Sequence, residues 1–341
     1  MNVAQKATSV TGLGATANST HTVDRWQTNV GSTAGRFTMT QTADGPNGIS
    51  ANCLKIDCTT ADTSIAAAEA FILHQGIEGQ NLQRIGKGVA GAKQITASFY
   101  VKASAAFTFA LELFDGDNNR QITKLFDTTT DWVRHEITFP ADVDDGSSPF
   151  DDDNSNSLDF GFWIHAGATF TGGTLNTASW ANFTNANRVV GIDSIFSSTD
   201  NNLFLTGVQL EVGPVATDFE QEDIGVTLAK CQRYYRRYGG NSTHERICTA
   251  FALSTTEARG VIENVVEMRT TPTIAVSAVG NFLTEHVGTN TACSAVAVDQ
   301  PSPKNTAINF TIGAANLTAG QGLQIVTNNT TNARLEIIAE F

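Results

Sequence analysis

The sequence predicts an all-β protein with an N-terminal jelly-roll β-sandwich, a short linker helix and a small C-terminal β-sandwich. Segments in which apolar and polar residues alternate recur along the chain, and this period of two is typical of half-buried strands. Only 16% of the residues are charged, while Thr, Asn, Gly and Ala are abundant, as in sheets joined by polar turns. With 341 residues, the chain is long enough for two domains that each bury a core.

The N-terminal domain is expected to span residues 1–218. Its clearest strand is ITASFYVKA (95–103), in which every second residue from Ile95 to Val101 is apolar. The last strand, LFLTGVQLEV (203–212), ends before a Gly-Pro pair, because proline cannot continue the ladder of a central strand. The same alternation occurs in residues 52–58, 107–114 and 132–139. Many short strands separated by polar turns favour a sandwich or jelly roll.

Residues 219–240 are expected to form the linker helix. Acidic residues precede its apolar positions, basic residues follow them, and two glycines stand at the end, as helix polarity and stop signals require. The stripe fits either a helix lying on its own domain or three helices packed about a threefold axis, and it is too short to hold three chains together unaided. Its members, at spacings of four, three and four, are Ile224, Leu228, Cys231 and Tyr235.

Residues 241–341 form a second β-rich region. Alternating segments again predict strands, and no helical period interrupts them, so a small β-sandwich is the simplest architecture. The segments are CTAFALS, RGVIENVVEM, TPTIAVSAV, TAINFTI, GLQIVTN and ARLEIIAEF.

The charge balance excludes two classes of partner. The chain has 21 Lys and Arg against 34 Asp and Glu, a net charge of −13, so we expect neither nucleic-acid binding nor membrane insertion. No apolar stretch is long enough to span a bilayer, and the N-terminus lacks the pattern of a signal peptide. The five cysteines are scattered without a CxxC pair, which supports neither a disulfide framework nor a zinc site.

An acidic segment between Asp142 and Asp159 contains seven aspartates. Ca²⁺ prefers six to eight oxygen ligands, and Asp145, Asp151 and Asp153 are the candidates to supply some of them. The spacing does not match an EF-hand, and a solvated acidic loop is the simpler interpretation. The sequence therefore requires no cofactor and offers one candidate structural calcium site.

Glycan binding is the second kind of site considered. Aromatic faces can stack on sugar rings, and Trp180 and Phe183 stand in a polar segment where they are candidates for such a platform. Packing of Trp180 within its own domain is the alternative. Trp26, Trp132 and Trp163 stand in or beside predicted strands and are assigned to packing.

Signatures of catalysis are weak. The sequence contains no GxSxG, no HExxH and no phosphate-binding glycine loop, and its six histidines are dispersed. Two carboxylates of a glycoside hydrolase would leave no linear pattern, so a hydrolase is kept as the least favoured hypothesis. We predict that the protein is not an enzyme.

Six segments, taken in order, resemble a family of bacteriophage tail-fibre and virion proteins that carry a jelly roll like a carbohydrate-binding module and a C-terminal β domain. The fourth and fifth are the most specific, and together the six extend over most of the chain. They are VDRW (23–26), GIEGQNL (76–82), GAKQITASFYVKA (91–103), GVQLEVGPVATDFE (207–220), CQRYY (231–235) and MRTTPTI (268–274).

The resemblance implies a homotrimeric phage structural protein, with the linker helix at the trimer axis, displayed on the virion to recognise a host-surface glycan. Its partners would be other virion proteins, namely a fibre anchor, the baseplate or the capsid. The resemblance implies that the distal, C-terminal domain recognises the receptor. The candidate receptor contacts in that domain are Asn281, Asn290, Asn305 and Asn329. A decoration or cement protein without receptor binding is the alternative. The globular part is expected to begin almost directly after Met1, without a fibre shaft, so we expect either docking onto a separate anchor protein or a short fibre or decoration bound directly to the capsid, tail or baseplate.

Overall fold

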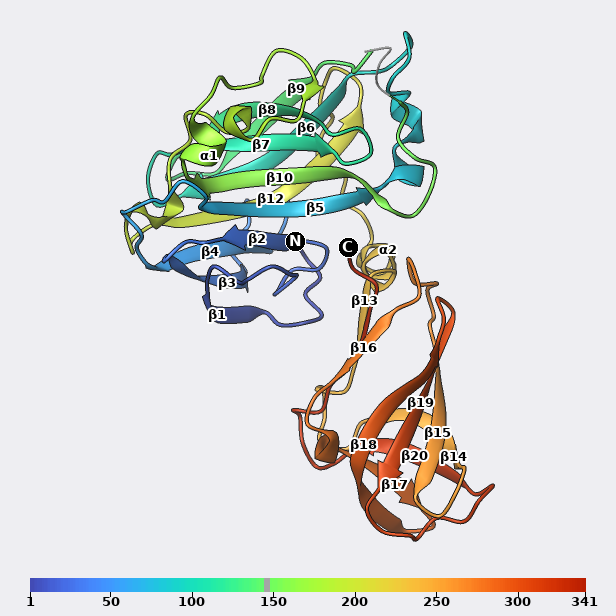
Figure 1. Cartoon of the computed structure of the whole chain (residues 1–341). Helices are drawn as coiled ribbons and strands as arrows, with labels where there is room; N and C mark the ends of the chain where they lie inside the picture. The colour runs from blue at the N-terminus through green and yellow to red at the C-terminus, as the bar shows by residue number, and fades with distance from the viewer. Residues whose placement is uncertain (144–147) are drawn as a thin grey trace. The chain divides into compact units, whose positions relative to one another are not determined.

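The computed structural model describes residues 1–143 and 148–341. The chain divides into two compact units, the first comprising residues 1–224 with the C-terminal Phe341 and the second residues 225–340. The all-β prediction is confirmed, because the described residues form β-sheets and only two short α-helices (Figure 1). No helix among them is long and apolar enough to cross a membrane.

The first unit is a sandwich of two antiparallel sheets (Figure 1). Sheet A has the spatial order β1 (Ser9–Leu13), β3 (Arg36–Thr42), β4 (Cys53–Thr60), β12 (Asn202–Val212), β6 (Ile95–Ala103) and β9 (Val133–Phe139). Sheet B has the order β11 (Ala181–Asn182), β8 (Arg120–Asp127), β7 (Thr108–Asp115), β10 (Asn156–Ala166), β5 (Ala70–Glu78) and β2 (Gln27–Gly31). The predicted N-terminal sandwich is therefore present.

Alternation along the strands explains the core between the two sheets. Ile95, Ala97, Phe99 and Val101 of β6 are all buried, as their shared face predicts. Phe99 packs edge to face against Phe162 of the facing sheet, with ring centres 4.9 Å apart. Aromatic pairs of this kind add specific geometry to the burial of apolar area. The core is thus a rigid layer on which both outer faces are supported.

Short helices connect the strands of the first unit. Helix α1 lies between β10 and β11 of sheet B, and the others lie in connections where the chain crosses from sheet B to sheet A. They are η1 (Gly79–Asn81), η2 (Gln83–Ile85), α1 (Ala168–Thr171), η3 (Asn185–Asn187) and η4 (Ile195–Ser197).

The second unit differs from the predicted C-terminal sandwich, because its main sheet closes on itself. The closed barrel has the order β14 (Arg246–Ala252), β15 (Glu257–Glu263), β19 (Asn305–Ile312), β18 (Thr289–Pro301), β17 (Phe282–His286) and β20 (Gly322–Thr327). A three-stranded sheet of β13 (Tyr235–Tyr238), β21 (Leu335–Ile338) and β16 (Thr273–Val276) completes the unit, with η5 (Val279–Asn281) between β16 and β17. Closure depends on the pairing of β14 with β20, which alternation alone cannot reveal.

The linker helix is shorter than predicted. Helix α2 spans Ile224–Gln232, whereas Tyr235 begins β13 and pairs with Ile338. Tyr235 is buried in β13, and its hydroxyl donates to Glu336 Oε1. Placing Tyr235 on the helical stripe was wrong, because its four-residue spacing from Cys231 also fits a turn followed by a strand.

Candidate functional site

The structure removes Trp180 from the candidate glycan platform. Its side chain is 8% exposed, and its Nε1 donates a hydrogen bond to Pro140 O at 2.9 Å. Burial of the ring faces leaves no surface for a sugar, so the packing alternative holds. Phe183 is half-buried, packs edge to face on Phe114 and lies 5.1 Å from the Arg188 guanidinium.

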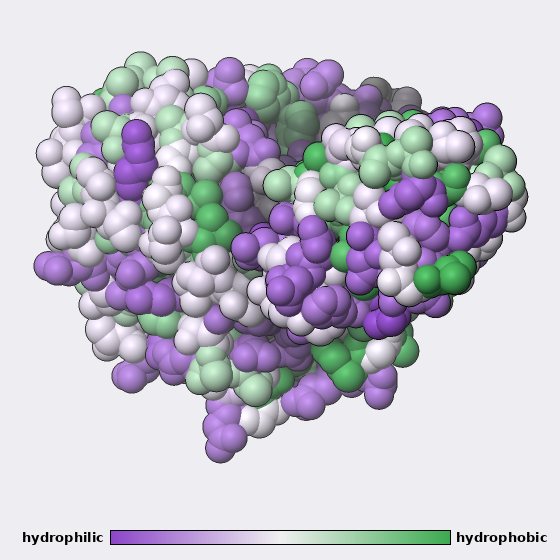
Figure 2. Space-filling view, turned by 90° about the horizontal axis from the view of Figure 1, so that it is seen from below, coloured by the Kyte–Doolittle hydropathy of each residue, from purple (hydrophilic) through white to green (hydrophobic). Residues whose placement is uncertain are grey.

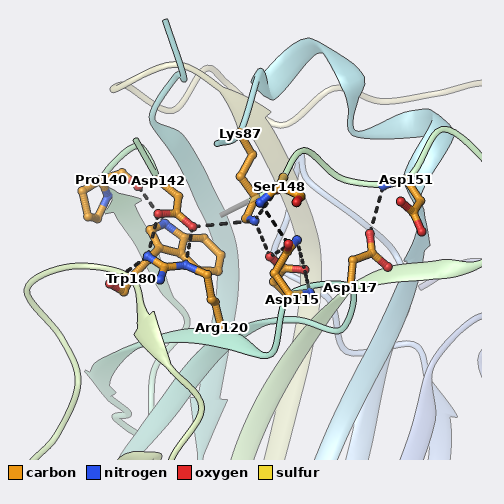
Figure 3. Close-up of polar contacts among 10 residues, drawn as sticks. Lys87, Asp115, Asp117, Arg120, Pro140, Asp142, Ser148, Asp151 and Trp180 are labelled. Atoms are coloured by element: carbon orange, nitrogen blue, oxygen red, sulfur yellow. Dashed lines mark hydrogen bonds and ion pairs between the residues drawn. The ribbon is translucent and has the colours of Figure 1, made fainter. Parts of the chain in front are cut away.

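Trp180 is held by a network of buried charges at the end of the sandwich (Figure 3). The network consists of Lys87, Asp115, Arg120 and Asp142, each less than a tenth exposed. Lys87 Nζ lies 2.5 Å from Asp115 Oδ2, and Arg120 makes two bonds of 2.8 Å to Asp142. Arg120 also donates to the Trp180 carbonyl at 3.2 Å. We call these four residues the charge clamp.

The charge clamp also fixes the chain that leads into and out of the acidic segment. Asp142 follows β9, and Lys87 donates to Ser148 O at 3.0 Å (Figure 3). A little further on, the Asp151 N–H donates to Asp117 Oδ2 at 3.0 Å. Two cations and two carboxylates balance each other, which is the condition for charges to be stable in a buried position.

The candidate calcium ligands are divided by these contacts. Asp145 lies outside the described residues, and Asp153 accepts bonds from the N–H and hydroxyl of Ser155. Residues 1–143 and 148–341 contain no cluster of three His, Cys, Asp or Glu side chains placed to hold a metal ion. Calcium binding stays a prediction from the sequence.

The four candidate asparagines of the second unit do not form one surface. Asn281 directly precedes β17. Its carbonyl accepts a hydrogen bond from the N–H of Asn328, which is the neighbour of Asn329 in the sequence. Asn290 stands at the opposite end of β17, opposite Glu285. Asn305 begins β19 and closes the β18–β19 hairpin through Ser302. Alternation places residues on a face but gives no information on which loops meet.

A different surface brings aromatic and charged side chains together on the outer face of sheet A. Phe204 of β12 pairs with Lys55 of β4 on one side and with Lys102 of β6 on the other. Lys102 Nζ lies 4.7 Å from the centre of the Phe204 ring and 5.2 Å from that of Trp132. Cross-strand neighbours on one face lie about 5 Å apart, so these side chains form a continuous line. We call Lys55, Phe204, Lys102 and Trp132 the lysine–aromatic row.

Local contacts hold the row in place. Lys102 pairs with Asp44 at 2.8 Å and Lys55 with Asp57 at 2.9 Å, so both ammonium groups have carboxylate partners. Trp132 Nε1 donates to Asp44 O at 3.1 Å, which ties the loop after β3 to the edge of the row. Both rings are half-buried, which leaves part of each one open to solvent. The row is therefore preorganised on a rigid sheet.

Sequence reasoning missed the row, although a signal was present. Phe204 stands between Leu203 and Leu205, both buried in the core, so alternation already placed Phe204 on the outer face. An aromatic residue at a polar position of a strand was the informative feature. Trp26 and Trp163 are buried as expected, but Trp132 is not.

One cluster has the composition of a hydrolytic triad. His165 Nδ1 lies 2.7 Å from Ser194 Oγ, and its Nε2 lies 3.0 Å from Glu69 Oε2. The His165 side chain is fully buried, however, and Ser194 Oγ already accepts the N–H of Phe196. A base that no substrate can approach is a structural element. Burial lowers the pKa of His165, although Glu69 and Asp62 act in the opposite direction.

The thiols are poor nucleophiles. Burial raises the pKa of Cys248 and Cys293 to about 12, and that of Cys53 and Cys58 to about 11. The thiolate is the reactive form, so these side chains are almost entirely protonated near neutral pH.

Comparison with known proteins gives fold-level likenesses only. No family model and no curated protein matches the chain. A solved family 4 carbohydrate-binding module is 9% identical, with 61% of this chain and 97% of that one covered and a TM-score of 0.29. A family 11 module of a Clostridium thermocellum cellulase is 12% identical, with coverage of 60% and 95% and a TM-score of 0.29.

A third similar structure is the enzymatically active domain of tailspike protein 4 from bacteriophage CBA120. It is 11% identical, covers 57% of this chain and 21% of that one, and has a TM-score of 0.31. Scores at this level carry no argument about function, which must rest on the residues of this chain.

Replacement of Asp142 by Ala is expected to destabilise the first unit by about 3–5 kcal/mol, because it removes the carboxylate that neutralises buried Arg120. Asp142→Asn keeps part of the hydrogen bonding and should cost less. Urea unfolding followed by tryptophan fluorescence isolates this unit, since all four tryptophans lie in it. Asp131→Ala, at an exposed position, is the control, and equal losses in both variants would contradict a role for the charge clamp.

The first unit is also expected to lose stability as the pH falls from about 7 to 5. The folded-state pKa values of His165 and His135 are lowered, chiefly by burial, so the unfolded chain takes up protons more readily once the pH drops below about 6.5. Thermal melts read by tryptophan fluorescence should show this slope, and His165→Gln should flatten it. The exposed His244→Gln should leave it unchanged, and an unaltered slope in His165→Gln would contradict the assignment.

Proposed function

We propose that this chain is a non-enzymatic structural protein of a bacteriophage virion, a tail fibre or short appendage that recognises a glycan on the host surface. The ordered sequence segments support the virion assignment. The lysine–aromatic row on the outer face of sheet A carries the glycan assignment, because it combines ring faces and charged hydrogen-bonding groups on a rigid, solvent-facing sheet.

The chemistry of sugars explains why such a row suits them. A hexose ring has an apolar face of C–H groups, which packs on an aromatic ring, and a rim of hydroxyls, which need donors and acceptors. In the row, Phe204 and Trp132 offer aromatic ring faces. Lys102 offers an ammonium group, and its partner Asp44 beside the row offers a carboxylate 2.8 Å away. Because these groups are already ordered, little conformational entropy is lost on binding.

The absence of catalysis is part of the proposal. The arrangement closest to a catalytic triad contains a fully buried histidine, His165, and burial raises the pKa of Cys248 and Cys293 to about 12, which keeps both thiols protonated near neutral pH. A glycan hydrolase would instead lower the molecular mass of the polysaccharide during incubation. We expect that mass to stay constant.

The proposed assembly is a homotrimer with α2 at its axis. Ile224 and Val226 of this helix are 56% and 47% exposed, so apolar side chains remain available for contacts between copies. Leu228 is half-buried and Cys231 is buried, so the outward part of the stripe is short. On the face of the molecule in Figure 2, apolar residues are interspersed with polar ones. Virion partners would complete the attachment, and a cement protein that binds no glycan remains the alternative.

Removal of a ring from the row is expected to weaken binding to host-surface polysaccharide at least about fivefold for Trp132→Ala and for Phe204→Ala. Affinity electrophoresis of the full chain in gels containing extracted host polysaccharide measures the change. Phe183→Ala is the matched control, since it removes a half-buried aromatic ring that directly follows β11 of the other sheet. Binding that depends on Phe183 and not on the row would contradict the proposed site, and no binding at all would favour a cement protein.

Light scattering is expected to give a mass near three times 36.2 kDa for the purified chain. Ile224→Asp should lower it, because a charge at the axis would be buried against its own copies. Val215→Asp, at a residue that is 71% exposed outside the helix, should have no effect. A monomeric wild-type protein would end the trimer proposal without affecting the glycan site.

A further inference from the structure

The wall of the C-terminal barrel carries an aromatic ring that packing does not explain. Phe251 of β14 is 47% exposed, more than any other aromatic side chain in the described part of the chain. Its neighbours in the strand, Ala250 and Ala252, are buried, so Phe251 stands on the outer face of the barrel. Burial in its own fold therefore accounts for only about half of this side chain.

Strand pairing places polar groups beside this ring. Phe251 pairs with Gly322 of β20 on one side and with Arg259 of β15 on the other. No atom lies within 4 Å of the position that a side chain on Gly322 would occupy, so the surface beside the ring is open. Arg259 pairs in turn with Asn309 of β19. The ring therefore lies between an open surface and a polar ridge.

The polar ridge is ordered by its own hydrogen bonds. Arg259 Nε donates to Asn309 Oδ1 at 2.9 Å, and its Nη2 lies 3.2 Å from Asp299 Oδ2. The Arg259 and Asp299 side chains are 34% and 26% exposed, so both can still meet a ligand. Their charges neutralise each other, which leaves fixed donors and acceptors without a net charge.

A further line of cross-strand neighbours lies beside Phe251 and Arg259 on the same wall of the barrel. Val261 pairs with Ala307, and Ala307 pairs with Gln300 of β18. Val261 is 45% exposed and Gln300 is exposed, so the surface beside Phe251 alternates small apolar and amide groups. Phe251 and Val261 together expose far less than the roughly 800 Å² that each partner buries in a stable protein interface, so the wall does not have the size of a protein-binding surface.

We infer that this wall, centred on Phe251, is a second carbohydrate site, specific for neutral sugar chains. The exposed ring suits the C–H face of a hexose, and the Arg259–Asn309–Asp299 ridge suits its hydroxyls. A carboxylated sugar would meet Asp299 and find Arg259 already neutralised, so neutral chains are preferred. The site shares its ligand class with the proposed function but consists of different residues in the other unit.

Saturation-transfer NMR on the full chain can separate the two sites. The probes are hexasaccharides of glucose, galactose and mannose, with a hexauronate as the charged comparison. In the Trp132→Ala background, binding of a neutral hexasaccharide should persist, and adding Phe251→Ala should weaken it at least about fivefold. Arg259→Lys should also weaken it, because lysine keeps the charge but loses the Nε bond to Asn309.

The control is Val265→Ala, which removes an apolar side chain that is 82% exposed in the loop after β15. Unchanged binding when Phe251→Ala is added to the Trp132→Ala background, the absence of any binding in Trp132→Ala alone, or a preference for the hexauronate would each overturn the inference. Loss of binding in Phe251→Ala with full binding in Trp132→Ala would support it while contradicting the lysine–aromatic row. A lower mass of Phe251→Ala in light scattering would assign the wall to contacts between copies and overturn the carbohydrate site.

Discussion

The insertion of β12 between β4 and β6 is the constraint on which the first unit depends. This strand is the last of the sandwich, yet it pairs with strands that precede it by about a hundred residues or more along the chain. Leu203 and Leu205 complete the core on one face, and Phe204 completes the lysine–aromatic row on the other. Core and candidate binding surface therefore form together, through one long-range pairing that is expected to be slow in folding.

Cations are paired with carboxylates both inside the first unit and on the candidate surfaces. The chain carries a net charge of −13, yet each cation of the charge clamp has a carboxylate partner, and so do Lys55 and Lys102 of the row. On the barrel wall Arg259 is neutralised by Asp299. The candidate surfaces are thus locally neutral areas of an acidic protein. Sugars, which offer many hydroxyls and an apolar ring face, suit such areas better than ionic ligands do.

About half of the strands in the described residues were predicted from the sequence, because alternation reports directly which face of a strand is buried, but β5, β10 and β18 were not singled out. It could not predict the closure of the barrel, since the pairing of β14 with β20 joins segments whose patterns look like those of a sandwich. Helix α2 was predicted too long because the four- and three-residue spacing of its apolar positions continues to Tyr235, which the structure places at the start of β13.

The candidate surfaces were missed for a different reason. Each is a line across several strands, and its composition depends on register, which period two does not specify. Phe204 and Phe251 could still have been selected individually, since each stands between two residues that are buried. What the sequence lacked was the identity of their neighbours, Lys55 and Lys102 for one and Arg259 and Gly322 for the other.

The two proposed sites lie on open sheet surfaces, and weak individual binding is expected of them, because an open surface buries little of a sugar chain compared with a closed pocket. In a virion appendage this weakness is compatible with firm attachment. When several sites in each chain and several copies of the chain face one polymer, each further contact becomes intramolecular, and avidity can exceed the single-site affinity by about 10²–10⁴. Rigid placement then matters more than tight contact, because only sites held in fixed positions can engage a repeating ligand together. Both proposed sites lie mainly on strands, with Trp132 directly before β9, which meets that requirement.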